Sequence, residues 1–133
     1  MKRINPGTLT NSVTHLISHI TVASSSRLAF VSGQVALNEK GELIGKGNYE
    51  LQVLQVFTNL SYALEALNAG PEHIVQMKIH VVDHQPELVE VIFNAGFQLF
   101  GTAWPLTAST YLGVQSLALP DWLIEVDMIV ELP

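Results

Sequence analysis

Two segments of the chain carry the three- and four-residue hydrophobic spacing that is typical of amphipathic helices. The stripe of the first segment, Tyr49–Ala69, consists of Leu51, Leu54, Phe57, Leu60, Leu64 and Leu67. Gly70 and Pro71 follow it and end the helix. The second segment begins at Pro86, since proline is tolerated in a first helical turn, and ends at Gly101. Its apolar face consists of Leu88, Val91, Ile92, Phe97, Leu99 and Phe100.

Five other segments are rich in β-branched and apolar residues and predict strands. They are Val13–Ala23, Arg27–Leu37, Glu72–Asp83, Thr107–Leu117 and Trp122–Leu132. The serines at positions 24–26 predict a hairpin between the first two strands, and residues 118–121 predict another between the last two. The order β-β-α-β-α-β-β predicts an α/β (α+β) sandwich in one domain, residues 1–133, with both helices on one face of a mixed sheet.

The last predicted strand alternates between two kinds of position. One face carries Glu125, Asp127, Ile129 and Glu131, and the other carries Ile124, Val126, Met128 and Val130. On this pattern alone the acidic residues lie on a face that is exposed to solvent. The nearest basic residue upstream is Lys78, and none follows it.

The composition is apolar for a small soluble monomer, because 48% of the residues are hydrophobic and 14% are charged. No run reaches the ~18–20 uninterrupted apolar residues of a membrane-spanning helix. We therefore expect an oligomer that buries apolar surface between its subunits, including the sheet face that two helices leave uncovered.

The charge, the cysteine content and the N-terminal sequence argue against several classes of protein. The net charge is −6, and the six basic residues are scattered rather than clustered, so we expect no nucleic-acid partner. The chain has no cysteine, which excludes disulfides and thiolate chemistry. The basic N-terminus is not followed by the apolar segment of a secretory signal, so a cytoplasmic protein without membrane association is expected.

Four stretches, in this order along the chain, resemble the RidA/YjgF family of reactive-intermediate deaminases. They are FVSGQVALNEKGELIG (residues 30–45), FTNLSYALEALNAG (57–70), IVQMKIHVVD (74–83) and PLTASTYLGVQSLALPDWLIEVD (105–127). The resemblance covers nearly the whole chain. It implies a chorismate-mutase-like fold, a homotrimer with a central barrel of sheets, and three clefts between subunits. It also implies hydrolysis of enamines and imines to a keto acid and ammonia, without a cofactor.

The resemblance also implies site residues. Ser32, Gly33 and Gln34 match the family's Ser-Gly-Gln segment, where backbone groups position the ligand, and Glu125 matches the glutamate that positions or activates water. Asn94 matches an asparagine of the second helix.

Two positions depart from the family pattern. The arginine that binds the substrate carboxylate in that family falls on Ser109, and neighbouring Thr110 is not basic either. The tyrosine that lies over the pocket falls on either Ile17 or His19. We therefore expect Ser109, Thr110 and His19 to serve as ligand-binding residues at most.

The sequence gives little support for a metal site or for a serine nucleophile. His80 and His84 have the spacing of a helical metal site, but they fall on a strand and the turn after it, so no metal is expected. Ser109 has no sign of a partner base or an oxyanion hole, which disfavours a serine nucleophile.

Three functions remain open. The first is a trimer whose clefts bind or act on a small carbonyl- or imine-type metabolite without efficient 2-imino-acid deamination. The second is a working enamine or imine deaminase, and the third is a structural or regulatory trimer with a vestigial cleft.

Overall fold

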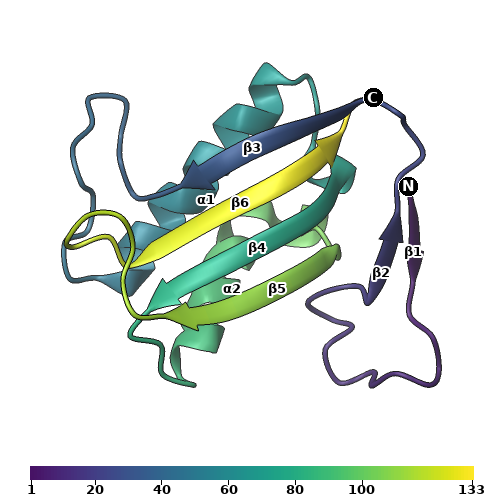
Figure 1. Ribbon diagram of the computed structural model, residues 1–133, viewed down its shortest axis with the longest axis horizontal. Helices are drawn as coiled ribbons and strands as arrows, with labels where there is room; N and C mark the ends of the chain where they lie inside the picture. Colours follow the sequence, from purple (N-terminus) through teal and green to yellow (C-terminus); the bar gives the residue numbers. More distant parts are fainter.

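The computed structural model describes residues 1–133 as a four-stranded sheet with two helices on one face (Figure 1). The strands are β3 (Leu28–Gln34), β6 (Ile124–Glu131), β4 (Ile74–Val82) and β5 (Ala108–Val114), in this order across the sheet. β4 and β5 are parallel and the other pairs are antiparallel. The predicted α+β sandwich with a mixed sheet is therefore confirmed.

Two predicted hairpins are wrong. The first failed because β2 (Ile20–Val22) pairs with β1 (Lys2–Ile4) in a separate small sheet and not with β3. The backbone N–H groups of Ser24 and Ser25 bind the carboxylate of Glu131 rather than closing a turn. The second failed because β4 lies between β5 and β6, so the last two strands are not neighbours.

Helix α1 (Tyr49–Ala66) begins at an asparagine cap, because Asn48 Oδ1 accepts a hydrogen bond from the Leu51 N–H at 3.0 Å. Its buried face is shifted from the predicted leucine stripe. Leu51 is 48% exposed, whereas the neighbouring Gln52 and Val53 are fully buried. The buried amide of Gln52 donates to the carbonyls of Gly45 and Asp121 and accepts from the Leu123 N–H.

Helix α2 (Leu88–Phe100) connects β4 to the parallel β5 and ends where Gly101 adopts a positive φ of 55°. Two short 3-10 turns follow the helices, η1 (Pro71–His73) and η2 (Gly101–Ala103). No helix of the structure is both long enough and apolar enough to cross a membrane.

Trp104 lies at the centre of the core between the two helices and is only 7% exposed. Its indole packs at ring-centroid distances of 5.5–6.2 Å against four phenylalanines: Phe57, Phe93, Phe97 and Phe100. The indole N–H donates to the carbonyl of Leu16 at 2.9 Å, which ties the N-terminal segment to the core.

The second face of the sheet has no helix over it. The predicted alternation of β6 holds for Glu125, Asp127 and Ile129, which are half-buried on this face, while the residues between them are buried under the helices. On β3 the side chain of Phe30 is 75% exposed.

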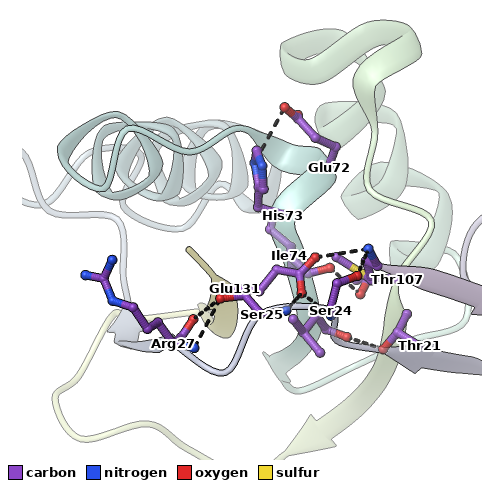
Figure 2. A network of polar contacts seen from close by, with 11 residues as sticks. Thr21, Ser24, Ser25, Arg27, Glu72, His73, Ile74, Thr107 and Glu131 are labelled. Carbon is purple, nitrogen blue, oxygen red and sulfur yellow. Dashed lines mark hydrogen bonds and ion pairs between the residues drawn. The ribbon is translucent and has the colours of Figure 1, made fainter. Parts of the chain in front are cut away.

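Glu131 breaks this pattern, because its carboxylate is buried. It accepts hydrogen bonds from the N–H groups of Ser24 and Ser25, at 2.6 and 3.1 Å (Figure 2). It also contacts the Met1 amino group at 3.3 Å. These contacts hold the pKa of Glu131 below its usual value, the Ser25 hydrogen bond contributing most. The N-terminal residues therefore bind to this end of β6.

Candidate functional site

An apolar hollow of about 290 Å³ opens at the edge of the sheet, beside β5. Its lining comes from the segment before β2, from β4, from α2 and from β5: Val13, Leu16, Ile17, Ile79, Val89, Phe93, Ser109 and Tyr111. Ser109 is the only residue of this lining without an apolar or aromatic side chain. The volume lies near the lower end of the range for ligand pockets, roughly 300–1,000 Å³, which suits a small molecule.

The outer wall of the hollow is a chain segment without helix or strand structure, residues 13–17. It is fixed at Leu16 by the Trp104 indole and, beyond the wall, at Ser18, which is 2% exposed. The Ser18 N–H donates to the carbonyl of Thr107 at 3.1 Å, and its hydroxyl donates to the carbonyl of Leu106. The loop between β1 and β2 thus lies beside the start of β5 (Figure 1).

Ser109 faces the helix side of the sheet, where it lines the hollow with Ile79 and Tyr111. Its hydroxyl donates to the carbonyl of Thr107 at 3.0 Å. Thr110 follows it and therefore points to the other face, opposite Lys78 in register. The two predicted hydroxyl-bearing residues thus lie on opposite faces of the sheet.

Tyr111, which lines the hollow, contacts His84, and the sequence did not indicate this pair. The phenol oxygen lies 3.3 Å from His84 Nδ1, and the two rings meet edge to face at 5.0 Å. Burial raises the pKa of Tyr111 to about 12, with a smaller contribution from Tyr49. A side chain at Gly113 would meet His84 Cβ at 2.9 Å, so this glycine leaves the space that the histidine occupies.

Glu125 lies on the helix-free face, against Gly33. A Cβ atom at Gly33 would stand 2.6 Å from Glu125 Oε1 and 2.8 Å from its Cγ, so only glycine leaves room for this side chain. Gly33 also lies in a β-bulge, since the register between β3 and β6 shifts between Val31 and Gln34. Within one chain, the Glu125 side chain therefore fills the space that Gly33 leaves by having no side chain.

A shallow depression lies next to Glu125 on the same face. It is lined by Phe30, Val31, Ser32, Gly33, Gln76, Lys78, Asp127, Met128 and Ile129. Lys78 lies opposite Asp127 in register. The sheet therefore places a cation beside Glu125 and Asp127, which have no basic residue near them in the sequence. The sequence missed this neighbour because the two residues are far apart along the chain.

The structure does not bring all the predicted site residues together. Glu125 and Ser109 lie on opposite faces of the sheet, with β4 between their strands. Asn94 is exposed on α2 beside three carboxylates, those of Glu50, Glu87 and Glu90.

Of the two candidates for the pocket position on the N-terminal segment, Ile17 lines the hollow and His19 does not. The imidazole Nε2 of His19 lies 2.7 Å from the Thr10 carbonyl, and the backbone N–H of His19 donates to Asn5 Oδ1 at 2.8 Å, so His19 holds the N-terminal loop.

His80 also has a structural contact. His80 Nδ1 lies 3.1 Å from the backbone carbonyl of Glu125. Because a carbonyl only accepts hydrogen bonds, Nδ1 carries the proton and Nε2 is left unprotonated in the neutral ring. The structure has no group of three or more His, Cys, Asp or Glu side chains arranged to hold a metal ion.

Comparisons with known proteins place this geometry in a family. Residues 12–132 match the family model described as endoribonuclease L-PSP. A RutC family protein from Synechocystis sp. is 34% identical over 107 residues, which cover 78% of each chain.

Solved structures agree with this assignment. YyfB from Yersinia pestis, described as a protein of unknown function of the conserved Rid protein family, is 37% identical over 98% of both chains, with a TM-score of 0.89. A putative endoribonuclease L-PSP from Entamoeba histolytica is 27% identical over 86% of both chains, with a TM-score of 0.68. The chain therefore belongs to the RidA/YjgF family, the family described as endoribonuclease L-PSP.

Proposed function

We propose that this protein is a homotrimer whose inter-subunit clefts bind or act on a small, uncharged carbonyl- or imine-type metabolite, and that it is not an efficient 2-imino-acid deaminase. The hollow beside β5 forms one wall of each cleft. No cofactor and no metal take part.

The uncharged lining of the hollow is the observation that carries this proposal. None of its eight residues is basic, and Ser109 stands at the position where the family resemblance places the arginine. A bidentate arginine–carboxylate pair is a strong, charge-assisted interaction. A carboxylate in this hollow would lose its water shell without gaining such a partner, which is costly. The lining favours a neutral ligand instead.

In the proposed trimer, Glu125 of one subunit lies in the cleft formed with its neighbour. Because Glu125 and Ser109 lie on opposite faces within one chain, a cleft that uses both residues takes them from different subunits. A trimer that covers the helix-free face also buries Phe30, which is 75% exposed in the single chain. Glu125 would then position water at the ligand.

The family description names a ribonuclease, but we do not propose that activity for this chain. RNA binding needs clustered Lys and Arg side chains to neutralise phosphates. The six basic residues of this chain are scattered and its net charge is −6. The proposal also includes a cytoplasmic location for the protein.

An imine-hydrolysis assay tests the proposal. An amino-acid oxidase generates the 2-imino acid in place, and semicarbazide traps what remains. The wild type, Ser109→Arg and Glu125→Ala are compared, with Gln115→Arg as a control that adds the same charge in the exposed loop after β5.

We expect the wild type to be inactive and Ser109→Arg alone to gain turnover. Efficient turnover by the wild type that Glu125→Ala abolishes would instead identify a working deaminase. Sedimentation of the wild type as a monomer would remove the inter-subunit cleft. A screen of neutral carbonyl compounds that leaves the melting temperature unchanged would favour the structural or regulatory trimer.

A further inference from the structure

The hydroxyl proton of Ser109 is already used inside the protein. Ser109 Oγ lies 3.0 Å from the carbonyl oxygen of Thr107, and because a carbonyl cannot donate, Ser109 must donate. The same carbonyl accepts the Ser18 N–H at 3.1 Å, so both of its acceptor positions are filled. The carbonyl of Thr107 therefore binds both the Ser109 hydroxyl and the N-terminal segment.

What Ser109 presents to the hollow is consequently a pair of oxygen lone pairs. The only other hydroxyl of the lining belongs to Tyr111, and it is engaged by His84 at 3.3 Å. The remaining lining residues bring only apolar side chains. Apart from the engaged Tyr111 hydroxyl, the side chains of the lining therefore offer one hydrogen-bond acceptor, Ser109 Oγ, whereas an arginine at this position would offer only donors.

We propose that the hollow selects a neutral molecule with an apolar body and one hydrogen-bond donor, a hydroxyl or an imine N–H, which is directed at Ser109 Oγ. This inference rests on the proposed function, since it specifies which uncharged metabolites the cleft accepts. Molecules that present only acceptors, such as ethers and carboxylates, are disfavoured, because their lone pairs would face those of Ser109.

The specificity follows from the cost of an unpaired polar group in an apolar site. A donor that reaches Ser109 replaces its hydrogen bond to water, whereas an ether oxygen at the same place loses its own bond and gains none. An ionised carboxylate loses more, because its charge is strongly hydrated.

Four matched probes test the inference on the assembled protein: cyclohexylmethanol, its methyl ether, ethylcyclohexane and cyclohexanecarboxylate at neutral pH. Dissociation constants are obtained from the amide NMR shifts of Ile17 and Tyr111, which report on the hollow itself. We expect the alcohol to bind about three- to tenfold more tightly than the ether, as one hydrogen bond implies, and the carboxylate to bind most weakly.

The variants assign this preference to one atom. In Ser109→Ala the preference for the alcohol over the ether falls to about one. Ser109→Thr, which keeps the hydroxyl, retains it, and so does Ser116→Ala, a serine-to-alanine change in the exposed loop. The comparison among probes in the wild type needs no variant, so it remains decisive if Ser109→Ala does not fold.

Two outcomes would overturn the inference while leaving the proposed function intact. They are a carboxylate that binds as tightly as the alcohol, and an alcohol preference that is unchanged in Ser109→Ala. If no probe shifts the Ile17 and Tyr111 amides in any variant, the hollow is not a ligand site, and the proposed function falls together with the inference.

Discussion

Replacing Gly33 with alanine tests whether the contact between β3 and Glu125 is as close as the structure indicates. The new Cβ would lie 2.6 Å from Glu125 Oε1 and 2.8 Å from Cγ, whereas ordinary contacts begin at 3.4 Å. Because the Cγ atom is involved as well as the carboxylate, the whole side chain must leave its position. Gly33 does not have a positive φ, so the backbone itself accepts alanine without strain.

Two opposing terms set the magnitude of the effect. Overpacking of a folded structure costs roughly 1–3 kcal/mol, and a half-exposed, flexible side chain such as Glu125 belongs at the lower end. Replacing glycine by alanine stabilises a protein by about 0.4–1 kcal/mol through the unfolded chain. We therefore expect Gly33→Ala alone to lower the free energy of unfolding by up to about 1 kcal/mol, and to raise it by about 0.5 kcal/mol in the Glu125→Ala background.

A double-mutant cycle by urea unfolding, at one fixed protein concentration, measures the difference between the two backgrounds. The wild type, both single variants and the double variant are required, and the expected coupling energy is about 1–2 kcal/mol. If Gly33→Ala changes the free energy of unfolding equally in both backgrounds, the Glu125 side chain does not lie on Gly33 and our description of this face is wrong.

Three further substitutions test other contacts. Gln52→Leu should lower the free energy of unfolding by about 2–3 kcal/mol, because it removes three buried hydrogen bonds, while the exposed Gln98→Leu should change it little in the same urea titration. Since the pKa of Glu131 is lowered in the folded state, chiefly by the Ser25 N–H, its stabilisation is present above about pH 4.5 and is lost as the pH falls; Glu131→Gln should therefore flatten the acid limb of a stability-against-pH curve. Burial raises the pKa of Tyr111 to about 12, so the stability that Tyr111 contributes is complete below pH 10 and is lost as the pH rises toward 12. Tyr111→Phe has no phenol to ionise, so its free energy of unfolding should fall less than that of the wild type in alkaline unfolding experiments. An equal alkaline loss of stability in both proteins would contradict this.

The helices were predictable from the sequence, because each has a local stripe and a local stop signal. The helix predicted over residues 49–69 ends at Ala66, and the one predicted from Pro86 begins at Leu88. The strand pairings were not predictable, because pairing depends on distant segments. Nothing near β2 indicates that its partner is β1, which precedes it by 15 residues that form no helix.

The candidate site was only partly visible for the same reason. Strand alternation correctly placed Glu125 opposite the buried residues of β6. The same alternation separates Ser109 from Thr110, yet both were expected to bind the ligand. The pair of Tyr111 and His84 had no sequence signal at all, because parallel pairing of β4 with β5 creates it.

The wall of the hollow has an origin that bears on how quickly a ligand exchanges. Residues 13–17 belong to no helix or strand and are held by few contacts, chiefly those of Leu16 and, just beyond the wall, Ser18. Segments held in this way open locally, without global unfolding, at a lower free energy than the sheet. Each opening removes one side of the hollow. We therefore expect release of the proposed ligand to follow the openings of this segment, and the ligand to slow hydrogen exchange at the Ser18 amide while leaving the amides of β6 unchanged.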